Sequence, residues 1–438
     1  MTTELASTGN TISTPGYSRT RIIVAGLIGN MLEWYDFSIY GFFAVQIGAT
    51  FFHSSDPVSQ SLSAFGIFAM GFLTRPLGSV IFGHIGDKHG RTSALTISIV
   101  GMAATTLGMG LLPGYATIGV AAPVLLTILR MLQGVAVGGE AAIAGVFMIE
   151  QAPRGRRALS GAIGGVGNGL GLQVGSLIVL ALAGSMSPEE LADWGWRLPF
   201  LLSIVVGIGG FWVRRALRDM PERTVESTGT PIVELFRHHL PLLLRIGALA
   251  CFMAIGFQAA FIYVASWLQT VDGIAPVHAF KINSTSMLLI TPVSLFFGWL
   301  ADLWGRKGLL LVGAGIGVLG SVPFFMLMQN DSFTMIYLGQ LGFVLAIGIQ
   351  FGVMQALMVE TTPLDIRCTA LAVGNNIAWS VFGGLTPLVA TWLIYRTTDE
   401  RSPAYLIVGA AAITLTALLF TRDPFKREIG RPVPAPTK

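Results

Sequence analysis

Long stretches without a charged residue alternate with short polar turns along most of this chain. A helix needs about 20 apolar residues to cross the hydrocarbon core of a bilayer. Pro113 and Gly114 divide the longest stretch into two parts. Each uncharged stretch is long enough to span a membrane, and together they cover residues 92–129, 158–188, 246–271, 282–301, 308–330, 332–359, 368–395 and 402–421.

Four further apolar segments complete the pattern, namely 22–47, 61–86, the second half of 92–149, and 198–213. The sequence thus predicts an all-α membrane protein with twelve transmembrane helices. Composition agrees, because 53% of the 438 residues are hydrophobic and only 11% are charged, against about 25% charged residues in an average soluble domain. A soluble chain of this size could not bury so much apolar surface.

Lysine and arginine residues are concentrated on one side of the predicted bundle. If the N-terminus is cytoplasmic, that side carries 21 of them, two remain within the membrane, and the opposite side carries Arg197, Lys281, Arg396 and Arg401. Because positive residues favour the cytoplasmic side, we expect both termini to be cytoplasmic. The first 18 residues are polar and lack the basic region and cleavage site of a signal peptide, so we expect a disordered tail at 1–20.

Two turn motifs each occur twice, at nearly the same spacing. G-x-x-x-D-x-x-G-R is found at residues 83–91 and 298–306, and E-x-x-P-x-x-x-R at residues 150–157 and 360–367. A common offset of two motifs indicates a duplicated unit. We therefore predict two pseudo-symmetric halves of six helices, 21–216 and 241–421, joined by a cytoplasmic linker at 217–240 and followed by a short cytoplasmic tail at 422–438.

The charged residues of these turns lie at the predicted cytoplasmic helix ends. Acid–base pairs between helix ends could hold one conformation and break in the other, and terminal charges also interact with the helix dipole. We interpret them as a gating latch, although they could instead only anchor the helices and set the topology. They are Asp87, Arg91, Asp302, Arg306, Glu150, Arg157, Glu360 and Arg367.

These motifs resemble a known group of transporters. The paired G-x-x-x-D-x-x-G-R turns are similar to the signature of the major facilitator superfamily. The resemblance extends over residues 20–425 and implies alternating access around a central site, driven by a proton gradient, in a bacterial inner membrane. Three stretches resemble the metabolite:proton symporter family within it, namely 29–37 with Tyr40 and Gly41, 113–119 continuing to 130–134 and 138–140, and 382–387.

The resemblance does not name a substrate, because that family includes carriers of citrate, tricarballylate, 2-oxoglutarate, shikimate, proline and betaine. Its proline/betaine members carry a long cytoplasmic C-terminal coiled coil. The segment after Thr421 has 17 residues, with prolines and no heptad pattern. This departure argues against the osmoprotectant substrates without excluding them.

Five ionisable residues fall within predicted spans, where a charge is costly and usually functional. They are Glu33, Asp36, Arg75, Arg130 and Glu140, all in the N-terminal half. At a rise of about 1.5 Å per residue, Glu33 and Arg75 lie near the midplane, Asp36 and Arg130 lie further outward, and Glu140 lies nearer the cytoplasm. We expect Glu140 to act in gating or helix pairing.

An Asp36–Arg130 pair is expected, because the resemblance implies that the first and fourth spans meet. A carboxylate beside an arginine stays ionised, and its protonation would release the arginine to bind an anionic substrate. We assign proton coupling to Asp36, with Glu33 as the rival, and binding of a substrate carboxylate to Arg130 and Arg75. The alternatives are a permanent structural ion pair and, for Arg75, a bridge to the carbonyl that Pro76 leaves free.

Neutral polar residues at mid-membrane depth could complete the substrate site. Each of them could also be an ordinary helix–helix hydrogen bond. They are Asn30, Gln133, Gln173, Gln258, Tyr263, Asn375, Asn376 and Trp379.

Together these features favour a proton-coupled symporter that imports a small organic anion, either a di- or tricarboxylate or an aromatic acid. The alternatives are a zwitterion carrier of the proline/betaine type and, from another class, a membrane receptor or channel. No histidine is buried within a predicted span, since His84 belongs to the cytoplasmic turn at the end of 61–86, and no Gly-rich nucleotide loop is present. We therefore expect no metal, no cofactor and no enzymatic activity. Basic residues do not cluster as nucleic-acid binding requires, and we expect a monomer in the lipid bilayer.

Overall fold

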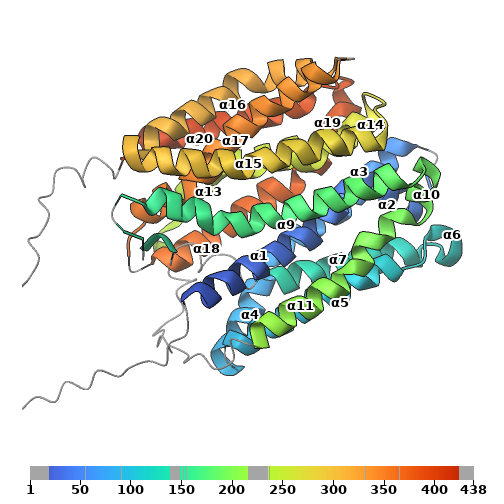
Figure 1. Ribbon diagram of the computed structural model, residues 1–438, viewed down its shortest axis with the longest axis horizontal. Coiled ribbons are helices and arrows are strands. Elements are labelled where there is room, and N and C mark those ends of the chain that lie inside the picture. The colour runs from blue at the N-terminus through green and yellow to red at the C-terminus, as the bar shows by residue number, and fades with distance from the viewer. Residues whose placement is uncertain are drawn as a thin grey trace, which may run out of the picture.

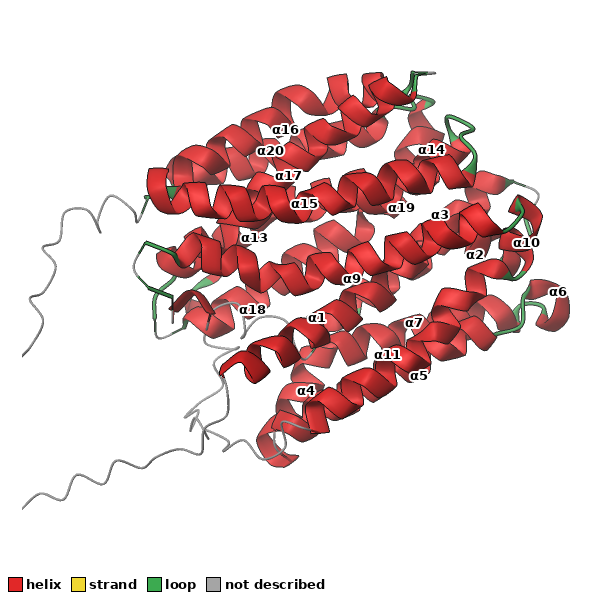
Figure 2. Ribbon diagram, in the orientation of Figure 1, coloured by secondary structure: helices red, strands yellow, loops and turns green. Residues whose placement is uncertain are grey.

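The computed structural model describes residues 19–54, 56–89, 91–138, 148–150, 152–153, 155–215, 235, 237–330, 332–364 and 366–423. All regular structure in these residues is helical, and none of them forms a strand (Figure 2). Most of the expected tails, most of the expected linker at 217–240, and Glu140 lie outside them.

Within the described residues, the N-terminal half forms six helical rods, two of which consist of consecutive helices. These two are α1 (Arg19–Phe42) with α2 (Ala44–Phe51), and α3 (Pro57–Leu73) with α4 (Arg75–His89). The other four are α5 (Arg91–Leu111), α7 (Ala121–Val137), α9 (Arg157–Ser185) and α11 (Leu198–Arg215). Short helices between them are α6 (Tyr115–Ile118), α10 (Pro188–Asp193) and η1 (Gly195–Arg197).

The C-terminal half also forms six rods. One consists of α13 (Leu240–Phe257), η2 (Gln258–Tyr263) and α14 (Val264–Thr270), and another of α18 (Arg367–Ile377), η3 (Ala378–Gly383) and α19 (Gly384–Thr397). The remaining four are α15 (Pro276–Trp304), α16 (Arg306–Met328), α17 (Phe333–Thr361) and α20 (Ser402–Phe420).

Length and composition suit these rods to a membrane. Of the helices in the described residues, 8 are long and apolar enough to cross a bilayer, and shorter apolar helices cover Thr96–Leu111, Ala121–Val137 and Gly195–Gly209. With the α1–α2 rod, they correspond to the twelve predicted spans. The predicted all-α membrane fold is therefore confirmed.

The two halves lie side by side, with their helices roughly along the long axis of the molecule (Figure 1). Helix α9 packs against α1 of its own half and against α15 and α17 of the other half, and α3 packs against α19. The first described helix begins, and the last one ends, at the same end of the bundle (Figure 1). The interface between the halves therefore runs through the centre of the molecule.

Glycines in α9 allow this close approach. A Cβ at Gly175 would lie 2.7 Å from Ser38 Oγ of α1, and a Cβ at Gly169 would lie 2.7 Å from Thr291 Oγ1 of α15. Small residues let helix backbones approach closely in a membrane. The glycine-rich α9 can thus pack against both halves at once.

Four of the central rods are irregular near the middle. Helix α1 gives way to α2 at Phe43, α3 gives way to α4 at Thr74, and η2 and η3 are π-helical turns. Such turns are frequent at functional sites. Arg75, Gln258 and Trp379 lie in these irregular segments or next to them, so the chain departs from regular helix where candidate side chains occur.

Candidate functional site

A buried ion pair lies at the centre of the N-terminal half. Arg75, the first residue of α4, donates through Nη2 to Glu33 Oε1 of α1, and both residues are buried. The guanidinium carbon of Arg75 also lies 5.0 Å and 5.2 Å from the ring centroids of Phe37 and Phe72. The cation is therefore stabilised by one carboxylate and by aromatic faces.

Arg130 of α7 belongs to a second buried group. It is fully buried and donates to Gln133 Oε1, and Gln133 Nε2 donates to Thr106 Oγ1 at 2.6 Å. Its guanidinium carbon lies 4.1 to 5.0 Å from the rings of Phe37, Tyr40 and Phe68. Gly71 leaves room for it, since a Cβ there would lie 2.8 Å from Arg130 Nε.

Asp36 is buried on α1 near the Arg130 group, and its electrostatic neighbours are Thr106 and Arg130. Among the described side chains at the centre, Glu33 and Arg75 form a direct ion pair, whereas Asp36 and Arg130 do not. The pairing expected from the sequence is therefore corrected. The reason is that Arg130 turns toward Gln133 on its own helix, whereas Arg75 reaches across to α1.

Four aromatic side chains meet where the halves face each other. Trp34 of α1 contacts Trp379 of η3 and Phe257 of α13, with ring centroids 5.3 Å and 6.3 Å apart. Phe351 of α17 lies 5.5 Å from Phe257 and 6.3 Å from Trp379. We call Trp34, Phe257, Phe351 and Trp379 the aromatic cluster. One ring comes from the N-terminal half and three come from the C-terminal half.

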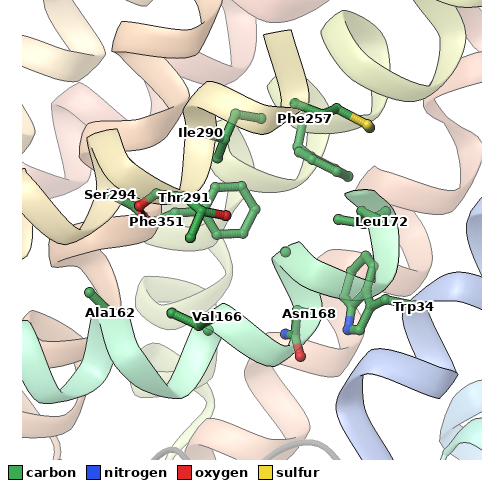
Figure 3. Close-up of a pocket in the computed structure, with 13 residues that line it drawn as sticks. Trp34, Ala162, Val166, Asn168, Leu172, Phe257, Ile290, Thr291, Ser294 and Phe351 are labelled. Carbon is green, nitrogen blue, oxygen red and sulfur yellow. Dashed lines mark hydrogen bonds between the residues drawn. The ribbon is translucent and has the colours of Figure 1, made fainter. Parts of the chain in front are cut away.

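A pocket opens beside this cluster, between α9 and α15 (Figure 3). Its wall includes Trp34, Phe257 and Phe351, with Asn168, Thr291 and Ser294 as polar members, and no lining residue is charged. The cavity volume is about 40 Å³, enough for a few water molecules. A metabolite therefore needs more space than this cavity offers in the present arrangement.

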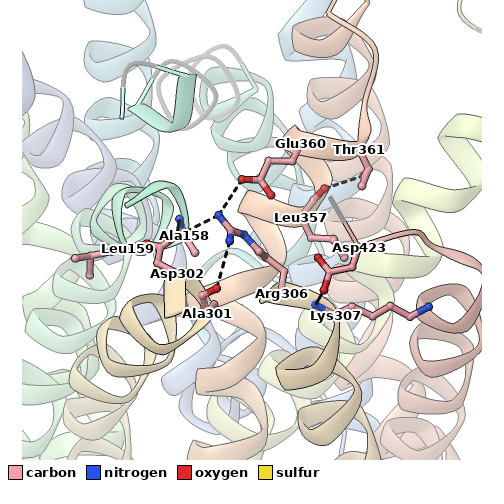
Figure 4. Close-up of polar contacts among 10 residues, drawn as sticks. All are labelled: Ala158, Leu159, Ala301, Asp302, Arg306, Lys307, Leu357, Glu360, Thr361 and Asp423. Atoms are coloured by element: carbon pink, nitrogen blue, oxygen red, sulfur yellow. Dashed lines mark hydrogen bonds and ion pairs between the residues drawn. The ribbon is translucent and has the colours of Figure 1, made fainter. Parts of the chain in front are cut away.

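Contacts between the halves occur at two levels of the bundle. At one level, Ser284 Oγ of α15 donates to Ser176 O of α9 at 3.0 Å, and Gln173 Nε2 donates to Ser284 O at 3.3 Å. At one end of the bundle, residues of the second motif copies meet the N-terminus of α9 (Figure 4). We call this end the latch end.

At the latch end, Asp302 joins the two halves. Its carboxylate accepts hydrogen bonds from the backbone N–H groups of Ala158 and Leu159 at 3.0 Å and 2.9 Å, at the N-terminus of α9 (Figure 4). An anion is favoured there by the unpaired amides and the helix dipole. Arg306 donates to Asp302 at 3.1 Å and to Glu360 at 3.0 Å. The second motif copies thus form one network.

A second contact between the halves lies nearby. Arg367 Nη1 donates to Glu150 Oε1 at 2.6 Å, while its Nε and Nη2 donate to Thr362 O. Arg157 is the first residue of α9 and is half-buried. The side chains of Asp87 and Arg91 lie outside the described part of the chain. The structure therefore brings together five of the eight residues predicted to form the latch.

Among the other predicted site residues, Gln258 and Tyr263 are buried at the two ends of η2. Asn375 is half-buried and lies on α18, one turn before Trp379. Asn30 and Asn376 are also half-buried, and no contact of their side chains points to a role. Gln173 forms the helix–helix hydrogen bond that was its alternative interpretation.

Sequence reasoning missed Trp34, Phe257, Phe351 and Asn168. The three rings look like ordinary members of apolar spans, although Trp34 lies next to Glu33 in the motif of the first span. Asn168 carried a usable signal, because it is one of two amide side chains, with Gln173, within the glycine-rich part of span five. In the structure its Oδ1 is buried without a hydrogen-bond partner among the described residues.

Comparison with known proteins agrees with this architecture. The model of the Major Facilitator Superfamily matches residues 26–387 and 284–438. A putative proline/betaine transporter of Staphylococcus aureus is 35% identical over 416 residues, covering 91% of this chain and 87% of that protein. The glycine betaine/proline/ectoine/pipecolic acid transporter of Dickeya dadantii is 33% identical over 429 residues, covering 95% and 85%.

Solved structures show the same fold. A partially occluded inward open conformation of the xylose transporter of E. coli superposes with a TM-score of 0.69 at 15% identity, covering 94% of this chain and 99% of that one. The crystal structure of a D-xylose-proton symporter gives 0.70 at 18% identity, covering 92% and 97%. The chain therefore belongs to the major facilitator superfamily and is a multi-pass membrane transporter, as its repeated turns predicted.

Proposed function

We propose that this chain is a proton-coupled symporter for a small zwitterion of the proline/betaine type. The observation that supports this most directly is the acid–base pair of the membrane centre, Glu33–Arg75, the one ion pair among the described side chains there, beside an aromatic pocket without a charged lining residue. Arg75 lies 5.9 Å from the Trp34 ring, which itself lines that pocket. The printed names of the relatives point to the same class of solute.

The charged groups at the membrane centre favour a zwitterion as the substrate over the organic anion expected from the sequence. A di- or tricarboxylate would need two or more available positive groups. Arg75 is already paired with Glu33, Arg130 is enclosed by rings, and neither arginine lines the pocket. A zwitterion has no net charge. It can therefore bind when its carboxylate replaces that of Glu33 as the partner of Arg75.

The pair suggests how a proton and a solute could bind together. While Glu33 is ionised, it holds Arg75; once Glu33 takes up a proton, the guanidinium is available to the carboxylate of the solute. The solute then replaces Glu33 as the counter-ion. Arg75 is never left unpaired in the interior, which would cost about 3–5 kcal/mol. In this scheme Glu33 carries the proton, and Asp36 is the alternative carrier.

The latch end would supply the conformational step. Asp302 and Arg367 connect the halves in this structure, so the site opens toward that side only after these contacts break. We expect a bound solute and proton to favour a different arrangement of the halves from the one that the ion pair favours alone. Under the positive-inside expectation, the latch end faces the cytoplasm.

Uptake into proteoliposomes tests this proposal. The purified protein is reconstituted, a pH gradient (acid outside) is imposed, and accumulation of labelled proline, glycine betaine, citrate, 2-oxoglutarate and shikimate is measured with and without an uncoupler. We expect accumulation of proline and glycine betaine above equilibrium, abolished by the uncoupler. Accumulation of the acids alone would overturn the substrate assignment, and accumulation that survives the uncoupler would overturn proton coupling.

A further inference from the structure

We propose that the aromatic cluster is a subsite for a quaternary ammonium group, so that this site selects fully methylated zwitterions over zwitterions with N–H groups. This inference rests on the proposed function and names the part of the substrate that the cluster would recognise. Three of its rings, Trp34, Phe257 and Phe351, line the pocket. The fourth, Trp379, contacts all the others.

The chemistry of the cluster suits a cation that has no proton to donate. A quaternary ammonium spreads its charge over methyl groups and cannot hydrogen-bond, so it is recognised by aromatic faces. The rings come from α1, α13, α17 and η3, and the angles between contacting planes run from 44° to 87°. Their faces therefore point in several directions, like the walls of a cage rather than a stack.

The neutral polar groups near the cluster are few. Gln258 is 1% exposed, and its Oε1 has no hydrogen-bond partner among the described residues. It lies near Trp379, since a Cβ at Gly383 would be 3.4 Å from Trp379 Cε3 and 3.6 Å from Gln258 Cγ. A secondary ammonium such as that of proline could donate to this oxygen. The cluster thus offers four rings to a methylated cation, while an N–H would use the buried acceptors beside it, among them Gln258 Oε1 and Asn168 Oδ1.

The rings also connect substrate recognition to movement of the halves. Trp34 belongs to the N-terminal half, and its contacts with Phe257 and Trp379 cross to the C-terminal half. The cavity of about 40 Å³ is too small for a trimethylammonium group. The solute therefore enters as Trp34 separates from the other rings, and ring–cation contacts replace ring–ring contacts across the interface.

Isothermal titration of the purified protein tests the subsite without requiring proton coupling. The ligands are glycine betaine, proline and tert-butylacetate, in which a neutral carbon replaces the ammonium nitrogen of glycine betaine. We expect glycine betaine to bind at least about tenfold more tightly than tert-butylacetate. Trp379→Leu should weaken glycine betaine about tenfold and proline by less than about threefold, and Trp379→Phe should restore most of the loss.

Two further variants make the pattern specific. Gln258→Met should weaken proline more than glycine betaine, which reverses the effect of Trp379→Leu. Trp299→Leu replaces a half-exposed ring on the outer face of α15 and should leave both affinities unchanged. If Trp379→Leu does not fold, Phe351→Leu takes its place and should show the same selective loss.

Equal binding of glycine betaine and tert-butylacetate would overturn the inference, because apolar contact alone would then explain the site. Equal weakening of both zwitterions by Trp379→Leu would overturn it too, since the ring would then have only a packing role. In both cases the proposed function would stand, because the protein would still bind its zwitterions. Failure of the wild type to bind either zwitterion would overturn the proposed function as well.

Discussion

The membrane centre and the latch end both contain a fully buried arginine, but the two arginines have different partners. At the latch end, Arg306 donates to two carboxylates and to the carbonyl of Ala301, and Asp302 also accepts two backbone N–H groups. At the centre, Arg130 donates to the neutral Gln133, and its guanidinium lies against the rings of Phe37, Tyr40 and Phe68. The arginine of the latch end is therefore held by carboxylates, whereas Arg130 is held by aromatic faces and an amide.

The two regions also differ in what their charges connect. The Glu33–Arg75 pair and the Arg130 group lie within the N-terminal half, while Asp302 and Arg367 bond across to the opposite half. A change at the centre should alter what is bound and coupled. A change at the latch end should alter which conformation is populated. The following variants test this division, beginning with the largest expected effect.

Glu33→Gln should have the largest effect. It removes the counter-ion of Arg75 and the group that we propose to carry the proton, so gradient-driven accumulation of glycine betaine should fall to simple equilibration. Exchange of labelled for unlabelled solute across the membrane should continue, because exchange needs no net proton movement. Uptake with an imposed pH gradient, and exchange without one, are measured in the same proteoliposomes.

Asp36→Asn is the matched control for that variant. Asp36 is buried on the same helix, three residues away, but makes no direct ion pair with Arg130. We expect slower uptake that still reaches a concentration above equilibrium. The reverse outcome, with accumulation lost in Asp36→Asn and kept in Glu33→Gln, would mean that Asp36 carries the proton, as the sequence predicted.

Asp302→Asn should shift the conformational equilibrium by about tenfold toward an open latch end. The substitution removes a charge from bonds to Arg306 and to the amides of α9, and such bonds contribute about 1–3 kcal/mol when buried. Spin labels at the exposed positions Arg156 and Leu364, in a chain without its native cysteines, report the distance between the halves. An unchanged distance distribution would mean that Asp302 only anchors its helix.

Arg367→Ala should have a smaller effect on the same distance. Its partner Glu150 is 37% exposed at the side chain, and exposed ion pairs contribute about 0.2–1 kcal/mol. We expect a shift of about twofold, seen with the same labels. A shift as large as that of Asp302→Asn would make Arg367 an equal part of the latch and would weaken the argument from burial.

Asp272→Asn should have the smallest effect, at the end opposite the latch. Burial, and secondarily the neighbouring Glu400 carboxylate, raises the pKa of Asp272 to about 7, against about 3.9 in an unfolded chain. The folded protein holds this proton more tightly, so the contribution of Asp272 to stability falls as the pH rises from about 4 to 7. Asp272→Asn has no carboxyl group to titrate at this position, so its stability does not fall for this reason as the pH rises.

Thermal unfolding in detergent at pH 5.5 and pH 8.5 measures the difference. Relative to wild type, the Asp272→Asn melting temperature should rise by about 1–2 °C between the two pH values. A constant difference between the proteins at both pH values would show that Asp272 does not titrate in this range.

The sequence was sufficient for the architecture, because it follows from the lengths of the apolar segments along the chain. The similar depths predicted for Glu33 and Arg75 from the rise of a helix agree with the ion pair that these residues form. Repetition made the latch residues visible, since Asp302 and Arg306 repeat the spacing of Asp87 and Arg91.

The contact partners of individual side chains were harder to predict, because they depend on how each helix is rotated about its axis. Arg130 is fully buried, but its side chain turns to Gln133 instead of Asp36. The aromatic cluster joins rings from four helices, and each ring alone looks like an ordinary core residue. The bond from Asp302 to the backbone of α9 was also out of reach, since every residue except proline has such an N–H.

The most direct test of the central assignment is proton movement caused by the solute alone. Proteoliposomes with a pH-sensitive dye inside, no imposed gradient and a permeant ion to balance charge are mixed with external glycine betaine. We expect the interior to acidify with the wild type and not with Glu33→Gln, although both exchange labelled solute. Solute entry through the wild type without acidification would contradict proton symport, and acidification through Glu33→Gln would contradict the role of the Glu33–Arg75 pair.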